Sequence, residues 1–290
     1  PFCLCRHMNG CSGATMIEGK LSLVLPAHNE DENIGQVIER AHQVLPRLAQ
    51  SFEIIAVNDG SSDNTAAIIA QYAGRDSRVR LVHHEINQGY GAALRSGFTA
   101  STGDWVMIMD SDRQFDIADL VYLAPFTSQY DMVAGFRKQR NDPVHRTLFG
   151  KTFRLAMKVL FGVQLKDIDC AFKLMRGDLL RSLDLQSDGA MISTELMARW
   201  ARAGGSLTQV GVHHYPRTAG QQSGGSLRVI LRAMRDVPIL WFRVHREHEP
   251  DPQAGSYEPR SAGLSPLSAV LIVMILGLLG LVTSRLVRRQ

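Results

Sequence analysis

Short apolar runs alternate with longer segments in which apolar residues recur every three or four positions through the first half of the chain. Such short runs are typical of β-strands, and the longer segments are typical of amphipathic helices. The predicted strands are Leu21–Leu25, Glu53–Val57, Val79–Val82, Trp105–Met109 and Asp131–Ala134. The predicted helices between them are Glu32–Leu48, Asp63–Ala73 and Tyr90–Ala100. This β-α-β-α order predicts an α/β, Rossmann-like fold with a mostly parallel, doubly wound sheet and flanking helices.

A polar motif follows each of the first four predicted strands. These motifs are Pro26-Ala-His-Asn-Glu30, Asn58-Asp-Gly-Ser-Ser-Asp63, Asn87-Gln-Gly-Tyr-Gly91 and Asp110-Ser-Asp112. Open parallel sheets bind their ligands at the carboxyl ends of the strands. We therefore expect the four motifs to form one site.

The fourth motif carries the clearest chemistry. The apolar run that begins at Trp105 ends in Asp110 and Asp112, and Gln114 follows two residues later. Carboxylate and amide oxygens suit Mg²⁺ or Mn²⁺, and Mg²⁺ commonly keeps positions for substrate phosphates. The alternative is a polar turn that caps a helix starting near Asp116, because Asp is a frequent N-cap residue. The neighbouring motifs favour the metal site.

The other three motifs each have two interpretations. Asn29 or Asp31 could serve only as a helix N-cap, whereas Asp59, at a strand end, could hydrogen-bond a nucleobase or ribose. Gly89 and Gly91 are placed where backbone approaches closely or adopts positive φ. The third glycine of a dinucleotide fingerprint is missing, which argues against a nicotinamide dehydrogenase.

A long uncharged segment lies near the C-terminus, between Arg260 and Arg285. About 20 apolar residues, rising ~1.5 Å each, cross the hydrocarbon core of a bilayer. The sequence therefore predicts a transmembrane helix over 264–284, preceded by a polar linker over 247–263 and followed by a basic tail over 285–290.

Two further segments, 144–162 and 225–246, mix Arg and Lys with Leu, Phe and Trp. This pattern is typical of helices that lie in a membrane interface, although core helices with a solvated charged face also show it. We predict an interface helix for 225–246, because the transmembrane segment follows it, and leave both interpretations open for 144–162. The predicted catalytic domain covers 17–224.

Composition adds little to this picture. The 290 residues suit one large or two small domains, and a net charge of +4 does not argue for a nucleic-acid partner. Three of the four cysteines, Cys3, Cys5 and Cys11, fall in the first 16 residues. Their spacing matches no common zinc site, so a disordered N-terminal extension over 1–16 and a reducing compartment are expected.

The order of the four motifs resembles the family 2 glycosyltransferases of the GT-A fold. Within that family it is most similar to the branch of dolichol-phosphate mannose synthases and polyprenyl-phosphate glycosyltransferases. The resemblance runs from about Leu21 to Arg246 and includes Ala134-Gly-Phe-Arg137 and the segment from Asp169 to Arg176. It implies metal-dependent, inverting transfer of a sugar, mannose first and glucose next, from a GDP-mannose or UDP-glucose type donor to a polyprenyl or dolichyl phosphate.

The resemblance also implies roles for individual residues. The donor would be bound by Pro26, His28, Glu30, Val57, Asp59, Asp110, Ser111, Asp112, Arg137 and Arg217. The metal, Mg²⁺ or Mn²⁺, would be held by Asp110, Asp112 and Gln114. The catalytic set would be Asp110, Asp112, Arg137 and Arg217, and Arg137 and Arg146 would contact the acceptor phosphate.

The chain departs from the family pattern at three positions. His28 replaces the usual Tyr, Ser223 stands where a Lys is expected, and Gly150 replaces a small hydroxyl residue. These departures leave the reaction class unchanged but bear on the identity of the sugar and the nucleotide.

Two other functions compete with this one. A transferase with a hydroxyl acceptor would need a carboxylate base, for which Glu195 or Asp169 are candidates, although a structural role for Glu195 fits its place on a helix. A membrane-tethered nucleotide-sugar binder without activity is the second. The positive-inside rule applied to the basic tail would place that tail in the cytoplasm. Because nucleotide sugars are cytoplasmic, we expect a cytoplasmic catalytic domain on a single-pass C-terminal anchor.

Overall fold

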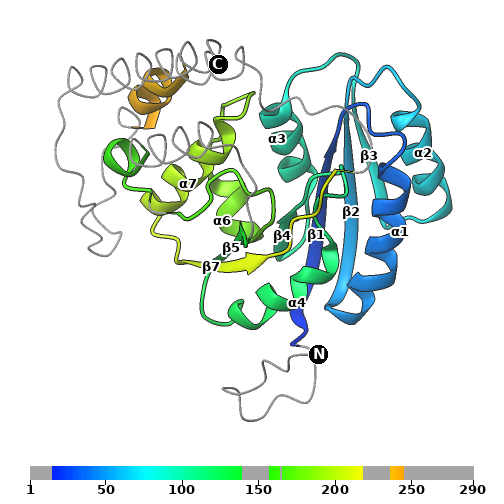
Figure 1. Ribbon diagram of the computed structural model, residues 1–290, viewed down its shortest axis with the longest axis horizontal. Coiled ribbons are helices and arrows are strands. Elements are labelled where there is room, and N and C mark those ends of the chain that lie inside the picture. The colour runs from blue at the N-terminus through cyan, green and yellow to red at the C-terminus, as the bar shows by residue number, and fades with distance from the viewer. Residues whose placement is uncertain (1–14, 139–156, 164, 218–235, 245–290) are drawn as a thin grey trace, which may run out of the picture.

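A computed structural model describes residues 15–138, 157–163, 165–217 and 236–244 of the protein. Within these residues the strands form one seven-stranded sheet in the order β3-β2-β1-β4-β6-β5-β7, and helices cover both of its faces (Figure 1). The strands are β1 (Ile17–Ala27), β2 (Ala49–Asp59), β3 (Val79–His84), β4 (Trp105–Ile108), β5 (Met132–Arg137), β6 (Lys173–Arg176) and β7 (Leu207–Val212).

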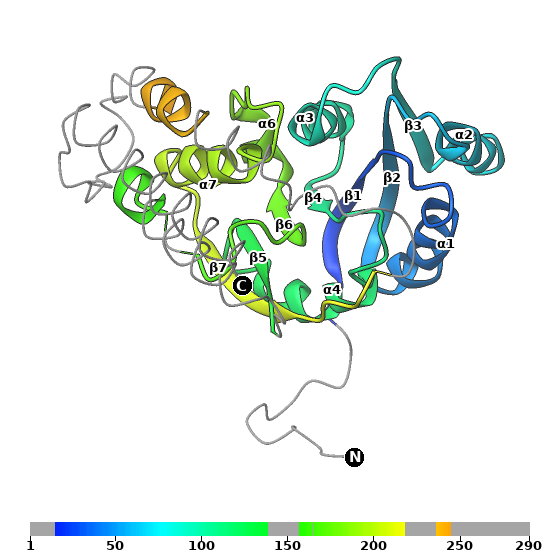
Figure 2. The same ribbon diagram turned by 45° about the horizontal axis from the view of Figure 1, so that its top comes forward.

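The longer helices are α1 (Ile34–Val44), α2 (Thr65–Arg75), α3 (Tyr90–Ala100), α6 (Gly177–Ser182) and α7 (Ile192–Arg202). Shorter helical segments are η1 (Leu45–Arg47), η2 (Ile117–Asp119), α4 (Leu120–Leu123) and η3 (Ala124–Phe126). The sheet separates α3, α6 and α7 from α1, α2 and α4 (Figure 2).

One strand runs against the others. β6 is antiparallel to both β4 and β5, whereas the remaining neighbours in the sheet are parallel. Six strands therefore end at one edge of the sheet, and β6 begins there. Lys173, the first residue of β6, lies opposite Ile108 of β4 and Ala134 of β5. This register brings the ends of β4 and β5 to the same edge as the polar motifs.

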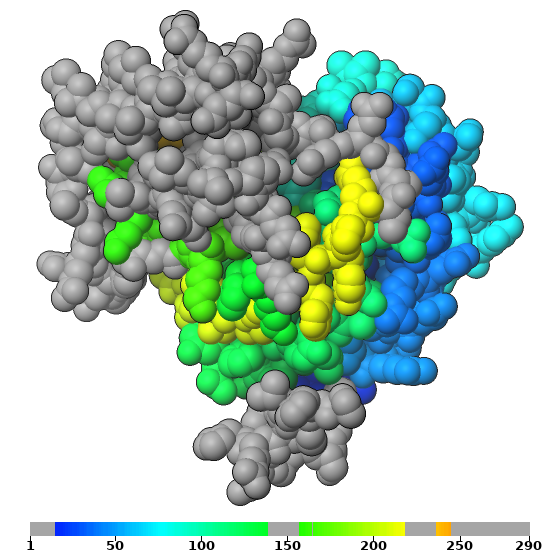
Figure 3. Space-filling model, in the orientation of Figure 1, coloured from blue at the N-terminus to red at the C-terminus, as the bar shows by residue number. Residues whose placement is uncertain are grey.

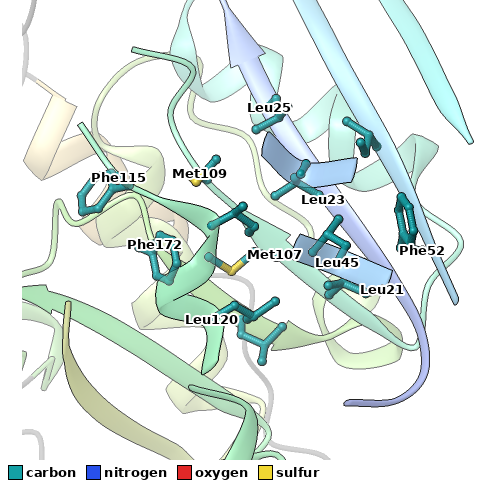
Figure 4. Close-up of a cluster of buried hydrophobic side chains, with 14 of the residues drawn as sticks. Leu21, Leu23, Leu25, Leu45, Phe52, Met107, Met109, Phe115, Leu120 and Phe172 are labelled. Atoms are coloured by element: carbon teal, nitrogen blue, oxygen red, sulfur yellow. The ribbon is translucent and has the colours of Figure 1, made fainter. Parts of the chain in front are cut away.

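Alternating residues of β1 supply two separate cores, because successive side chains of a strand point to opposite faces. Leu21, Leu23 and Leu25 pack with α1 and α4 in the first core, part of which is drawn in Figure 4. Val24 packs with α3, α6 and α7 in the second. Full burial of one such side chain stabilises the fold by roughly 1.5–3 kcal/mol.

A buried carboxylate, Glu53 of β2, ties the sheet together at the edge opposite the site. It accepts hydrogen bonds from Ser22 Oγ (2.6 Å), Lys20 Nζ (3.1 Å) and the backbone N–H of Thr102 (2.8 Å). Burial would raise the pKa of Glu53, but these hydrogen bonds outweigh it and lower the pKa to about 2. Glu53 is therefore ionised at neutral pH, which is the state its donors require.

All five predicted strands are confirmed, with ends that differ by a few residues. The predicted helix Glu32–Leu48 is shorter: α1 ends at Val44 and a 3-10 turn follows. Pro46 lies in that turn and has no N–H to extend the helical ladder. The sequence had not predicted β6, α6 or β7, and it had anticipated α7 only as a helix that carries Glu195.

Parts of the two basic amphipathic segments are helical, over residues 157–161 and 236–244. Each buries apolar side chains in the second core, including Leu160 and Leu240, yet Val159, Ile239 and Phe242 are exposed. Of the helices within the described residues, none is both long and apolar enough to cross a bilayer. The predicted transmembrane segment, 264–284, lies outside the described residues, as do residues 1–14 of the predicted extension and the linker and tail.

Candidate active site

The ends of β1, β4 and β7 meet at the carboxyl edge of the sheet. The hydroxyl of Ser111 donates to the carbonyl oxygen of Pro26 (2.8 Å), which joins the segment after β4 to the end of β1. One nitrogen of Arg217, Nη2, contacts Asp112 Oδ2 at 2.9 Å and Glu30 Oε1 at 3.3 Å. The segment that carries Arg217 runs from β7 across the visible face toward the N-terminal half of the chain (yellow and blue, Figure 3). The structure thus brings together residues that are up to 187 positions apart.

The segment after β4 is a tight turn around Asp112. Asp112 Oδ1 accepts from the backbone N–H of Gln114 (3.0 Å), and Arg113 between them has a φ of 62°. Gln114 is tied to the segment after β7 in both directions: its side-chain amide donates to Tyr215 O (3.2 Å), and Tyr215 N donates to Gln114 O (2.9 Å). The turn after β4 and the strand β7 therefore fix one another.

Asp110 lies in an environment that disfavours its negative charge. Burial raises its pKa to about 7, and repulsion from Asp112 adds to this rise. A hydrogen bond from the Tyr90 hydroxyl, and the charges of Lys173 and Arg217, act in the opposite direction. Two carboxylates thus carry more negative charge than their surroundings neutralise, which a bound cation would relieve.

The donor set fits a hard divalent cation. Asp110 and Asp112 offer carboxylate oxygens, and a guanidinium nitrogen already lies 2.9 Å from Asp112, so this carboxylate attracts a cation. Among the residues that the structure describes, no three His, Cys, Asp or Glu side chains gather into a group that could hold a metal. Such a two-carboxylate site suits Mg²⁺ or Mn²⁺, which take their remaining oxygens from phosphate and water. The Gln114 amide lies beside this site, and its ligand role stays a prediction.

The residues expected to bind the nucleotide differ in exposure. His28 is exposed, and its Nδ1 donates to the carbonyl oxygen of Asp59 (2.8 Å). Val57 is fully buried in the second core, so a ligand contact there would fall to its backbone. Pro26 is also buried. These three positions stay predicted contacts.

Asp59 is turned into the protein. One carboxylate oxygen accepts from Gln88 N (2.9 Å) and His84 Nδ1 (2.8 Å), and the other accepts from Gly89 N (2.9 Å). The side chain is 5% exposed. Asp59 therefore holds the loop before α3 in place, a structural role that had not been predicted.

The loop before α3 meets a second loop that precedes α7. Gly91 N donates to Asp188 O (2.7 Å), and Gly89 has a φ of 103°. A Cβ on Gly91 would lie 2.2 Å from Ser187 O. Both reasons proposed from the sequence therefore apply: Gly89 and Gly91 allow close backbone contact, and Gly89 also adopts a positive φ.

Glu195, a residue of α7, holds that second loop in place. It is fully buried, and its two oxygens accept from Gln186 N, Ser187 N and Arg199 Nε. A carboxylate that is surrounded by hydrogen-bond donors and buried from solvent has a structural role. This geometry agrees with the structural interpretation of Glu195.

Arg137, the last residue of β5, pairs with Asp167 in a two-pronged contact (Nε to Oδ2 2.6 Å, Nη2 to Oδ1 2.9 Å). Burial would lower the pKa of Arg137, but the hydrogen bonds to Asp167 raise it above the usual range. The loop that carries Asp167 is held by Lys173, whose buried Nζ donates to the carbonyls of Ile168 (3.0 Å) and Cys170. Arg146 lies outside the described residues.

Comparison with known proteins places these features in a family. The model of the family described as Glycosyl transferase family 2 matches residues 22–184. The chain belongs to glycosyl transferase family 2. The matched range contains the four motifs, Arg137 and the loop that carries Asp167, whereas α7, β7 and Arg217 follow it.

Curated relatives in this family act on polyprenyl phosphates. The chain is 30% identical over 227 residues to the undecaprenyl-phosphate 4-deoxy-4-formamido-L-arabinose transferase of Pseudomonas fluorescens, covering 76% of this chain and 66% of that protein. It is 27% identical over 265 residues to the dodecaprenyl-phosphate galacturonate synthase of Rhizobium johnstonii, covering 89% and 76%. The chain spans about two thirds to three quarters of the length of these two relatives.

Solved structures establish the fold. The glucosyl-3-phosphoglycerate synthase of Mycobacterium tuberculosis, in complex with Mn²⁺ and UDP-glucose, has a TM-score of 0.60 at 22% identity, covering 83% of each chain. The mannosyl-3-phosphoglycerate synthase of Rubrobacter xylanophilus has a TM-score of 0.60 at 19% identity, covering 81% and 78%. The family 2 domain of this chain is therefore GT-A-like, as the sequence predicted.

Three residues of this family 2 site were not predicted from the sequence. Tyr90 contacts Asp110, Asp167 pairs with Arg137, and Lys173 holds the loop of Asp167. Two of them lie in or beside segments that the sequence had singled out, the Gly-Tyr-Gly motif and the segment from Asp169 to Arg176. Asp110 and Arg137 are 20 and 30 residues from Tyr90 and Asp167, so no local pattern indicated these two contacts, whereas Lys173 contacts carbonyls only three and five residues before it.

Proposed function

We propose that the protein transfers a sugar from a nucleoside diphosphate to the phosphate of a polyprenyl or dolichyl lipid at the cytoplasmic face of a membrane, with inversion at the anomeric carbon. The observation that carries this proposal is the convergence of Asp110 and Asp112 with Arg217 at the carboxyl edge of the sheet. Carboxylates that attract a divalent metal, next to an arginine, form a site suited to a diphosphate leaving group.

The chemistry follows from the charges. A metal held by Asp110 and Asp112 would neutralise the charge that develops on the departing diphosphate. Arg217 would add a guanidinium contact to the same phosphates, and Tyr90 would orient Asp110. The acceptor phosphate is already ionised at neutral pH, so its oxygen can attack the anomeric carbon without a general base, and direct displacement inverts that carbon.

The surroundings of Glu195 favour a phosphate acceptor over a hydroxyl acceptor. A hydroxyl acceptor needs a base to take its proton, and both Glu195 oxygens are already engaged by donors. Asp169, which is exposed and whose charge acts on Arg137 and Lys173, is the candidate base for the competing reaction. Its replacement by Asn therefore separates the two acceptor classes.

The relatives bear on the donor. Both curated relatives act on a polyprenyl phosphate, and their names give 4-deoxy-4-formamido-L-arabinose and galacturonate as the sugars. Mannose, the sugar expected first from the sequence, has no support among them. The structural neighbour in complex with UDP-glucose favours a uridine diphosphate donor, and we propose this donor ahead of GDP-mannose.

Membrane attachment completes the proposal. The acceptor's phosphate lies at the level of the lipid headgroups, so the site has to be held against the bilayer. We propose that the segment 264–284 spans the membrane and that the helix over 236–244 lies near the interface, where exposed Ile239 and Phe242 would contact lipid.

The test uses membranes that contain the full chain, a polyprenyl phosphate, Mn²⁺ or Mg²⁺, and labelled UDP-sugars or GDP-mannose. A labelled lipid product that requires metal and is lost in Asp112→Ala is expected. Unchanged turnover in Asp169→Asn is expected for a phosphate acceptor, and loss of turnover would indicate a hydroxyl acceptor. Donor binding without a lipid product from any donor would indicate a non-catalytic binder and overturn the proposal.

A further inference from the structure

Arg217 lies between two carboxylates that follow different strands, Glu30 after β1 and Asp112 after β4. Its Nη2 is 2.9 Å from Asp112 Oδ2 and 3.3 Å from Glu30 Oε1. Asp112 is one of the two carboxylates that fit the metal. The guanidinium of Arg217 thus contacts an oxygen to which a metal would bind, and the guanidinium and the metal would compete for that oxygen.

Glu30 is held rigidly in the orientation that this contact needs. Its second oxygen, Oε2, accepts from Asn33 Nδ2 (2.6 Å), and its backbone N–H donates to Thr65 Oγ1 (2.8 Å). Its carbonyl oxygen accepts from Ile34 N at the start of α1 (2.8 Å). Because the backbone and Oε2 of Glu30 are held by these hydrogen bonds, the other oxygen, Oε1, points toward Arg217.

We propose that Glu30 is a positioning residue that holds Arg217 against Asp112 as a built-in counter-cation, and that donor binding transfers the guanidinium from Asp112 to the diphosphate. This inference rests on the metal dependence in the proposed function. Arg217 neutralises Asp112 while the metal is absent, and a diphosphate that draws Arg217 away opens Asp112 to the metal. Metal and nucleotide therefore strengthen one another's binding, and the coupling is reciprocal.

The sign of one measurement separates this role from a simple charge effect. Glu30→Gln removes a negative charge near a cation site, so electrostatics by itself predicts weaker Mn²⁺ binding. The proposed role predicts tighter Mn²⁺ binding without nucleotide, because Arg217 loses its contact with Glu30 and therefore competes less for Asp112. We expect a gain of about fivefold, at the low end of measured coupling between sites.

The experiment titrates Mn²⁺ into the detergent-solubilised full chain and follows free Mn²⁺ by electron paramagnetic resonance, with and without UDP. Glu30→Gln is measured in the native background and in an Arg217→Ala background, with Glu32→Gln as the control for loss of an exposed neighbouring charge. We expect Glu30→Gln to tighten Mn²⁺ binding only where Arg217 is present, and to shrink the enhancement by UDP. If Glu30→Gln does not fold, Glu30→Asp takes its place, because the shorter side chain also releases Arg217.

Two failures can be told apart. If the native chain binds Mn²⁺ but Glu30→Gln leaves the affinity unchanged or weaker, the positioning role is wrong and the proposed function stands. If the native chain binds no Mn²⁺ with or without UDP, the metal dependence is wrong and the positioning role falls with it.

Discussion

Replacing Glu195 with glutamine changes a buried network of hydrogen bonds without changing its size. Oε1 of Glu195 faces Arg199 Nε (2.9 Å), Oε2 faces Ser187 N (2.7 Å), and Gln186 N lies 3.1 Å from both. Glutamine replaces one of these oxygens by an NH₂ group. In either orientation that NH₂ group meets a donor, so at least one contact becomes repulsive.

The cost follows from the burial and charge of this site. Removing one partner of a buried ion pair destabilises a protein by about 3–5 kcal/mol, and the Arg199 guanidinium would lose such a partner. For a domain of this size, each kcal/mol lowers the melting temperature by about 2–4 °C. We therefore expect Glu195→Gln to melt about 10 °C below the native chain, while turnover per folded molecule stays within about twofold, because Glu195 is closed off from substrate.

The assay compares apparent melting temperatures at one scan rate with turnover measured well below both transitions. Glu85→Gln is the matched control, because Glu85 is exposed and undergoes the same chemical change. A native melting temperature combined with a loss of turnover of about 10²-fold or more, the effect of removing a general base, would refute this reasoning and restore Glu195 as the base.

Three further predictions concern the fold that supports the site. The pKa of Glu53 is lowered from 4.5 to about 2, so the stabilisation by its charge is present above pH 4.5 and is lost as the pH falls toward 2. Glu53→Gln should reduce the free energy of unfolding by about 3 kcal/mol at pH 7. Urea denaturation measures this difference, which should be smaller at pH 3. Burial raises the pKa of the Cys170 thiol to about 12, so peptide mapping after iodoacetamide treatment at pH 8 should find Cys170 unmodified until the chain is unfolded. Gly91→Ala places a Cβ 2.2 Å from Ser187 O and should destabilise the protein by about 1–3 kcal/mol. Gly74→Ala, in a helix with open space around it, should stabilise the protein by up to about 1 kcal/mol in the same denaturation experiment. Equal effects of the two changes would contradict this account of Gly91.

The strands and helices of the first half could be predicted because their signals are local. Residues such as Leu21, Leu23 and Leu25 repeat at the period of a strand, and α3 was predicted with the bounds that the structure has. The sequences of β6 and β7 indicate strands less clearly. β6 has only four residues and begins and ends with a charged residue, Lys173 and Arg176, and β7 mixes Thr, Gln and Gly with its apolar residues. A buried charge such as Lys173 is accepted only because nearby carbonyls satisfy it, and no local pattern indicates those carbonyls.

The sequence by itself determined which chemical groups stand at the carboxyl edge of the sheet, because strand period and polar strand ends are properties of neighbouring residues. Only the tertiary structure decided which charge meets which. The order of the strands brings Arg217 between Glu30 and Asp112 and gives Arg137 the carboxylate of Asp167. Electrostatic pairing depends on distance in space, and the order of the strands sets this distance. It brings into contact partners that are separated by 30 to 187 residues along the chain.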